Sequence, residues 1–82
     1  MKTISVWKNH TIRLETTFMG TKKIFYDGKL MTQGGNGFSD SNFLFSVSED
    51  GEDVHYELST RVSFGWDPHI TVRRNGVALY SD

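Results

Sequence analysis

The side chains able to do chemistry in this sequence are three histidines, a cluster of carboxylates and scattered hydroxyls, and their spacing decides what they can do. Zinc sites and zinc hydrolases place two histidines at H-x-x-H or H-E-x-x-H spacing, so that both imidazoles reach one ion. His10, His55 and His69 fit neither pattern, and the chain has no cysteine to complete a zinc site. Nucleophilic catalysis needs a nucleophile, a base and an orienting group, which no local motif here supplies. We therefore expect a protein that is not an enzyme and that has no cofactor or metal.

Four carboxylates surround Asp50-Gly51 at an expected hairpin tip: Glu49, Asp50, Glu52 and Asp53. A calcium loop of the EF-hand type distributes its ligands over twelve residues, and that spacing is missing. Adjacent carboxylates on a turn are ordinarily solvated, and they also keep a sheet edge from pairing. We expect a solvated cap rather than a metal site.

The glycine-rich segment Gln33–Ser41 raises the question of phosphate binding. It has neither a Lys-Ser/Thr pair after the glycines nor the G-x-G-x-x-G spacing, and no helix is expected to follow it. Its low apolar content predicts a surface loop.

The candidate binding surface consists of four aromatic residues and one arginine: Trp7, Tyr26, Trp66, Arg73 and Tyr80. Aromatics that project from a β surface can stack on sugar rings or bases, and Lys22, Lys23, Arg61, Arg73 and Arg74 can contact phosphates. The alternative is that Trp66 closes one end of the core and Trp7 packs under the first strand. A net charge of -1 argues against nucleic acid as the partner.

Three Asx-Gly pairs predict the hairpins that would position these residues, because a type I′ turn needs two consecutive residues with positive φ. With Asn75-Gly76 as a two-residue loop, the expected pairs are Arg74–Val77, Arg73–Ala78, Val72–Leu79, Thr71–Tyr80 and Ile70–Ser81. With Asp27-Gly28 as the loop, they are Tyr26–Lys29, Phe25–Leu30 and Ile24–Met31. In that second hairpin we expect Phe25 and Leu30 to face the core, and Ile24, Tyr26 and Met31 to cover an edge.

The hairpin around Asp50-Gly51 is expected to supply the middle of the core. It pairs Val47 with Val54, Phe45 with Tyr56 and Phe43 with Leu58 on one face, and Ser46 with His55 and Leu44 with Glu57 on the wetter face. The alternation continues through Thr60, Val62, Phe64 and Trp66, which is too long for one flat strand. We expect a bend or bulge between Ser59 and Ser63, and an end to pairing at Gly65 and Asp67-Pro68.

Two further strands are expected near the N-terminus, at 4–7 and 10–18, separated by a turn at Lys8-Asn9. Ile12, Leu14, Thr16 and Phe18 share one face of the second strand, which is the period of a half-buried strand.

These elements predict an all-β chain: one domain over residues 1–82, built from hairpins as a small antiparallel β-sandwich, or flattened barrel, of about seven or eight strands. The N-terminus lacks the apolar core of a signal peptide, and no window is long enough to span a bilayer. Small secreted domains often carry disulfides, and this chain of 82 residues has no cysteine. We therefore expect a soluble, complete, cytoplasmic protein that does not bind membranes.

The order of these elements resembles the Fas apoptotic inhibitory molecule family. The resemblance is carried by His10–Glu15, the Gly20 break, Lys22–Lys29 with its Asp-Gly turn, the Phe-rich strand and the closing Asn75-Gly76 hairpin that ends in Leu79-Tyr80. It implies a compact antiparallel β-sandwich without enzymatic activity, which works through protein contacts. The family usually has two such domains, whereas this chain has one, and the segment 34–41 departs from the family pattern.

Two functions follow as expectations. The first is a non-catalytic protein-interaction module whose partner is another protein. The alternative is a carbohydrate- or nucleic-acid-binding β domain that uses the surface aromatics. The expected edge strands at 4–7 and 77–80 can also pair with a second copy of the chain, giving a homodimer.

Overall fold

The computed structural model describes residues 2–35, 40–61 and 69–81, and this part of the chain is almost entirely extended. Its elements in chain order are β1 (Lys2–Ser5), the 3-10 turn η1 (Trp7–Asn9), β2 (Thr11–Thr16), β3 (Lys22–Tyr26), β4 (Lys29–Gly34), β5 (Ser41–Glu49), β6 (Glu52–Arg61), β7 (His69–Arg74) and β8 (Val77–Ser81). Each strand pairs antiparallel with its neighbour in sequence, in two sheets ordered β1-β2-β3-β4 and β5-β6-β7-β8.

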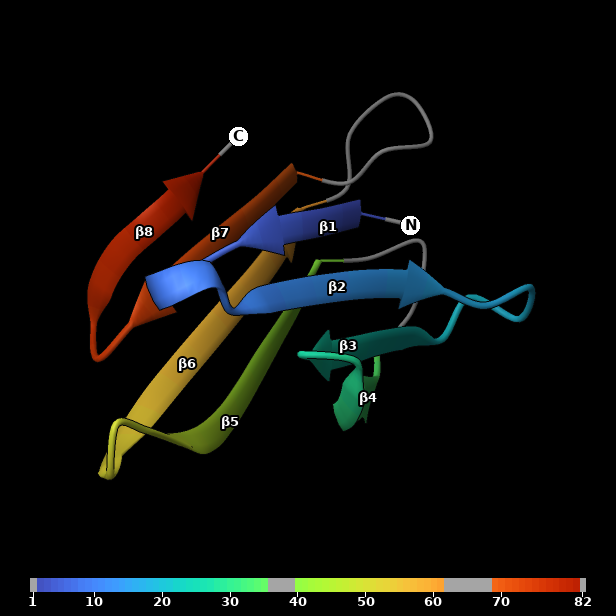
Figure 1. Cartoon of the computed structure of the whole chain (residues 1–82). Coiled ribbons are helices and arrows are strands. Elements are labelled where there is room, and N and C mark those ends of the chain that lie inside the picture. Colours follow the sequence, from blue (N-terminus) through green and yellow to red (C-terminus); the bar gives the residue numbers. More distant parts are fainter. Residues whose placement is uncertain (1, 36–39, 62–68, 82) are drawn as a thin grey trace.

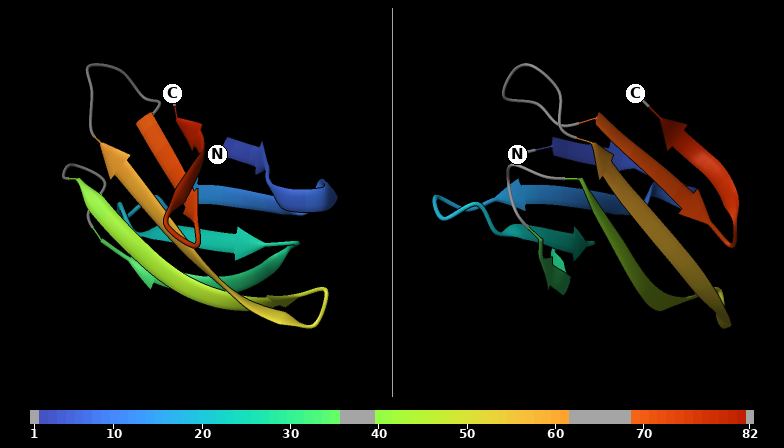
Figure 2. Two further views of the ribbon diagram at one scale, coloured as in Figure 1. Left: turned by 90° about the vertical axis from the view of Figure 1, so that its left-hand side faces the viewer. Right: turned by 180° about the vertical axis from the view of Figure 1, so that it is seen from behind.

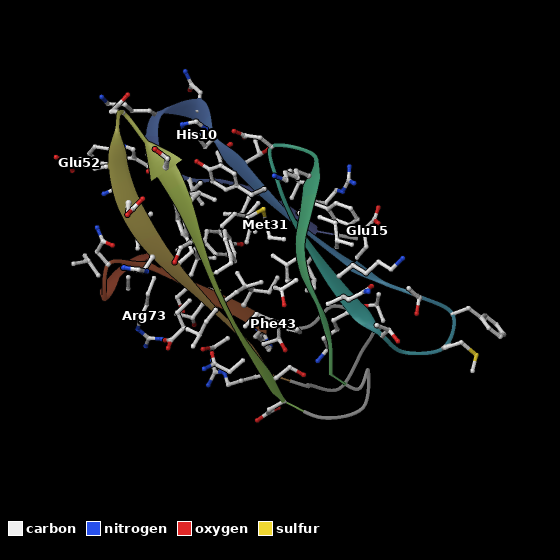
Figure 3. All side chains as sticks on the ribbon, turned by 90° about the horizontal axis from the view of Figure 1, so that it is seen from below. His10, Glu15, Met31, Phe43, Glu52 and Arg73 are labelled. Atoms are coloured by element: carbon white, nitrogen blue, oxygen red, sulfur yellow. The ribbon has the colours of Figure 1, made fainter. Side chains whose placement is uncertain are left out.

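The two sheets pack face to face, which confirms the predicted all-β sandwich (Figures 1 and 2). Strands β2 and β3 cross β5 and β6 obliquely, and β4 comes close to β5 along one side of the molecule. Both sheets contribute buried side chains to one core: Ile4, Ile12, Leu14, Ile24, Tyr26, Phe43, Phe45, Val54, Tyr56, Leu58, Ile70 and Val72. Figure 3 shows Met31 and Phe43 between the sheets, whereas Glu15 and Arg73 lie on the outside.

The three predicted two-residue turns are confirmed by their backbone angles. Asp27-Gly28, Asp50-Gly51 and Asn75-Gly76 each have positive φ at both positions, with 49° and 83° at the first pair. This combination is that of a type I′ turn, whose twist matches the twist of the strands that flank it. The complete predicted register of the β5–β6 hairpin is also confirmed, from Val47 opposite Val54 to Phe43 opposite Leu58.

The β3–β4 hairpin corrects two sequence-based predictions. Beyond the confirmed Phe25–Leu30 pair, a bulge shifts the register, so that Ile24 lies opposite Thr32 rather than Met31. The predicted faces are reversed: Ile24 and Tyr26 are buried, whereas Leu30 is exposed. The cause lies in the preceding strand, because Tyr26 and Ile24 pair with the inward-facing Ile12 and Leu14 of β2.

The β7–β8 hairpin contains a second bulge. The pairs Arg74–Val77 and Arg73–Ala78 are as predicted, but Leu79 is the additional residue, and Val72 lies opposite Tyr80 instead of Leu79. Thr71 therefore pairs with Ser81, not with Tyr80. Tyr80 packs against the core as a result, and Leu79 is left exposed.

The other differences lie at element ends. β2 stops at Thr16, so Phe18 belongs to the following turn rather than to the strand, and β1 ends at Ser5, with Trp7 in the 3-10 turn. Gln33 and Gly34 extend β4, which shortens the predicted glycine-rich loop. The alternation of β6 continues to the buried Thr60 and the strand ends at Arg61. The predictions for Val62, Phe64, Gly65, Trp66 and Asp67-Pro68 lie outside the described residues.

Candidate binding surfaces and the Glu49 cluster

The five residues of the predicted binding surface do not form one surface. Trp7 is 41% exposed, and the Arg74 guanidinium lies 4.5 Å from the centre of its ring. Tyr26 is buried in the core, which corrects its predicted place on the surface, and Tyr80 is partly buried. Arg73 lies on the outer face of the second sheet, and Trp66 is outside the described residues.

Three of the cations predicted to contact phosphate interact with other side chains of the domain. Arg73 donates to Glu57 across the strand pair, at 3.1 Å. Lys22 is almost completely buried, and its Nζ donates to Ser41 Oγ at 3.1 Å and to Thr60 Oγ1 at 3.0 Å. Burial lowers the pKa of Lys22, against an opposing effect of Asp40. Lys22 therefore joins the start of β3 to the second sheet.

The third cation, Arg74, belongs to a buried polar cluster around Glu49, at the end of β5. The Glu49 carboxylate accepts hydrogen bonds from the Tyr26 hydroxyl and, at 2.7 Å, from the Tyr56 hydroxyl. Arg74 Nε donates to its other oxygen at 3.0 Å. We refer to Tyr26, Glu49, Tyr56 and Arg74 as the Glu49 cluster. It draws on β3, β5, β6 and β7, and so it connects the two sheets.

Asp50, Glu52 and Asp53 are exposed, as predicted for a solvated acidic cap, but Glu49 is an exception, because only 3% of the residue is exposed. Burial alone would raise the pKa of its carboxyl, but the hydrogen bonds from Tyr26, Tyr56 and Arg74 outweigh that effect, and the pKa is lowered. Burial, and then the hydrogen bond to Glu49, raises the pKa of Tyr26 and of Tyr56. The cluster is thus a charged carboxylate held by two neutral phenols and a cation.

Polar contacts around the cluster fix the residues next to it. The His10 ring stacks on Tyr26 with 5.2 Å between ring centroids, and its Nδ1 lies 2.6 Å from Asp27 Oδ2. Lys8 Nζ donates to Asp50 at 2.7 Å, which brings the 3-10 turn to the tip of the β5–β6 hairpin. Figure 3 shows His10 near this tip, which also carries Glu52. The Lys8–Asp50 pair thus joins the N-terminal segment to the second sheet, and the His10 contacts join it to the β3–β4 hairpin.

Sequence reasoning missed the role of Glu49, although the sequence contains its signal. Phe43, Phe45 and Val47 alternate along β5 toward the predicted core, and the same period places Glu49 on the inward face. Glu49 follows Val47 by two residues, so the strand period directs its side chain inward although the residue is acidic. The buried carboxylate is stabilised by three hydrogen-bond donors, from Tyr26, Tyr56 and Arg74.

A different kind of surface occurs at the turn between β2 and β3. Phe18 and Met19 are 102% and 86% exposed, the largest exposures among the large apolar side chains of the described residues. The turn is held by its own hydrogen bonds, from Thr17 N to Thr21 O at 2.8 Å, from Gly20 N to Thr17 O at 2.9 Å and from Thr21 N to Thr17 Oγ1 at 3.1 Å. We call Phe18 and Met19 the apolar tip, and Figure 1 shows this turn extending beyond the body of the sandwich.

Strand β8 gives a third surface, because it is an edge of its sheet and pairs only with β7 within the described residues. Its sequence, Val77-Ala78-Leu79-Tyr80-Ser81, contains neither a charged residue nor proline. Val77 is 64% exposed and Leu79 41%. Charged residues, proline and bulges are usual protections of a sheet edge; β8 has the bulge at Leu79 and lacks the other two.

Among residues 2–35, 40–61 and 69–81, no three His, Asp or Glu side chains come together in a group able to hold a metal ion. No helix in the same residues has the length and apolar character needed to cross a membrane. No protein-family model, curated protein or solved structure matches this chain.

Proposed function

We propose that this chain is a non-catalytic protein-interaction module, related to the Fas apoptotic inhibitory molecule family, that binds another protein through its apolar tip. The observation that carries the proposal is the exposure of Phe18 and Met19, 102% and 86%, side by side on one turn. Single exposed apolar residues are common, but two adjacent large ones at the end of a hairpin are a typical interaction site. Aromatic residues and methionine are also enriched in protein interfaces.

The turn supports binding because its backbone is already ordered. Thr17 accepts from Gly20 and Thr21, and it donates to Thr21. Because these backbone groups are already hydrogen-bonded, a partner that encloses the tip leaves none of them without a hydrogen bond. The ordered turn also loses little conformational entropy on binding. The partner that fits is a protein with an apolar pocket of the size of a phenyl ring and a thioether.

A protein pocket fits this tip better than a lipid surface does. Peripheral membrane binding usually combines inserted apolar side chains with a group of basic residues. Of the nearest lysines, Lys22 is buried against Ser41 and Thr60, and Lys23 lies opposite Glu15 in the β2–β3 register. The net charge of the chain is -1.

The surface-aromatic alternative receives less support. Tyr26 is buried, and Arg74 covers one face of the Trp7 ring. The charged ends of Arg73 and Arg74 are each directed to a carboxylate, Glu57 and Glu49. A sugar or base would therefore have to displace contacts within the domain.

The test compares captured proteins among three forms of the domain: wild type, Phe18→Ser/Met19→Ser, and the control Leu44→Ser. Leu44 is 68% exposed on β5, so the control also removes an exposed apolar side chain, at another site. Captured proteins are identified by quantitative mass spectrometry, and the best candidate is purified for direct titration.

We expect a partner that is retained by wild type and by the control and is lost by the tip variant. Phe18→Ala should weaken binding to the purified partner by about tenfold or more, as is typical of an aromatic hot spot. All three forms should share one thermal midpoint, because the tip is outside the core. Capture that is equal for wild type and tip variant would contradict the proposal, and so would binding of wild type to neutral or anionic lipid vesicles that the tip variant loses.

A further inference from the structure

The four edges of the two sheets differ in how they are protected. β4 and β5 are edges of different sheets and lie close to one another, so each shields the other (Figure 2). β1 is an edge of only four residues. β8 is a five-residue edge made of apolar and hydroxyl residues only, and Figure 1 shows it at the outer side of the sheet, beyond β7. Very short strands, charged residues, bulges and neighbouring elements protect edges. Within the described residues β8 pairs only with β7 and carries no charge, and the bulge at Leu79 is its protective feature.

We infer that β8 is a self-association surface: two copies of this chain pair through antiparallel β8–β8 contact and join their second sheets into one continuous sheet. The inference does not depend on the apolar tip. A second strand added to such an edge replaces the water on its outward-facing main-chain groups with main-chain hydrogen bonds. An isologous pair related by a two-fold axis requires that the strand be complementary to itself.

The composition of β8 meets that requirement. Complete overlap of its five residues places Leu79 opposite Leu79 of the second copy, Val77 opposite Ser81, and Ala78 opposite Tyr80. Like charges directly opposite one another destabilise a strand pair, and this arrangement brings no charged residues of β8 together. The bulge between β7 and β8 leaves Leu79 outside the core, so its side chain is available at the centre of the contact.

The two arginines of the neighbouring strand β7 are paired with carboxylates, so they place no unpaired positive charge beside β8. Arg73 and Arg74 of β7 lie opposite Ala78 and Val77, but their guanidinium groups are directed to Glu57 and Glu49. In a pair of copies, unpaired arginines at these positions would repel one another. The carboxylates of Glu57 and Glu49 compensate their charge. Pairing would cover Val77 and Leu79, which are now 64% and 41% exposed.

The experiment is sedimentation equilibrium of the full chain over a range of concentrations. We expect the wild-type mass to rise with concentration toward twice 9.4 kDa. Leu79→Lys and Leu79→Glu should each remain monomeric, because the two-fold axis brings like charges together. An equimolar mixture of these two variants should recover the doubled mass, since opposite charges then face one another. Leu44→Lys, an exposed apolar-to-lysine change on β5, should associate as wild type does.

A second measurement uses the absence of cysteine from the chain. Under mild oxidation, Leu79→Cys should form a covalent dimer well ahead of the control Leu44→Cys, because only position 79 meets its own copy. Circular dichroism and tryptophan fluorescence confirm that each variant is folded. A wild-type mass that stays at 9.4 kDa at every concentration, or equal loss of association in Leu44→Lys, would overturn the inference.

Discussion

Tyr26 of the first sheet donates its phenolic hydrogen to the carboxylate of Glu49 in the second sheet, in the interior of the sandwich. Tyr56 and Arg74 complete the coordination of that carboxylate. The sheets are joined elsewhere mainly by apolar packing, which has no directional preference. The Glu49 cluster therefore also fixes how one sheet is oriented on the other.

Replacement of Glu49 by glutamine should be strongly destabilising. The amide cannot accept from two phenols and a guanidinium equally well, and Arg74 is left without its counter-charge in a largely buried position. Breaking a buried pair at one partner typically costs about 3–5 kcal/mol, a large part of the stability of a domain of this size. Urea unfolding followed by tryptophan fluorescence measures the loss. Glu52→Gln, at the exposed tip of the same hairpin, should change the free energy of unfolding by less than about 0.5 kcal/mol.

Acid should destabilise the wild type through the same carboxylate. The pKa of Glu49 in the folded protein lies below its ordinary value of 4.5, so the unfolded chain takes up this proton first as the pH falls. The stability that Glu49 provides is present above pH 4.5 and is lost as the pH falls through the folded-state pKa. Unfolding free energies measured between neutral pH and pH 3 should fall more steeply for wild type than for Glu49→Gln. Parallel curves would show that other carboxyls, such as Asp27, account for the acid sensitivity.

Alkali should reveal two tyrosines that resist ionisation. Burial and the hydrogen bond to Glu49 raise the pKa of Tyr26 and Tyr56 above the ordinary value of 10.0. The folded state holds these protons more tightly than the unfolded chain does, so their contribution is complete below pH 10 and is lost above it. Ultraviolet titration of phenolate should therefore show two groups that ionise only as the chain unfolds. In Tyr26→Phe/Tyr56→Phe this cooperative step should disappear.

Gly35→Ala should destabilise the domain more than the same change at Gly28. Both glycines have positive φ, 75° and 83°, so alanine is strained at either position. At Gly35 the new Cβ would also lie 2.6 Å from Ser41 Oγ, the atom that accepts from Lys22, whereas at Gly28 nothing lies within 4 Å. We expect a loss of about 1 kcal/mol at Gly28 and about 2 kcal/mol or more at Gly35. Thermal unfolding of both variants gives the difference, and equal losses would mean that Ser41 moves aside freely.

Much of the fold follows from local sequence signals. The pairs Asp27-Gly28, Asp50-Gly51 and Asn75-Gly76 form the expected turns, and the β5–β6 register follows directly from its turn because no residue is inserted after it. The other two hairpins each contain a bulge a few residues from a correctly predicted turn. A bulge depends on which face the preceding strand presents to the core, as Ile12 and Leu14 do for Tyr26 and Ile24, and that information is not local.

The binding surfaces were harder to predict, because aromatic or basic residue type does not determine whether a side chain is exposed. Aromatic character singled out Tyr26, yet its hydroxyl finds Glu49 inside the protein. Phe18 was assigned to the inward face of a strand, and it is exposed because the turn begins at Thr17. Exposure is set by where strands end, to within a residue or two, and sequence periodicity does not resolve that.

Every strand of this sandwich pairs with the strand before or after it in sequence, and the two sheets are consecutive halves of the chain. In such a topology, strand pairing can proceed as a succession of hairpin closures between consecutive strands. Each half can complete its own backbone pairing before the halves meet. A nick in the single segment between Gly35 and Asp40 would leave two fragments with whole sheets, each carrying one side of a common core, which makes this chain suited to reassembly from its halves.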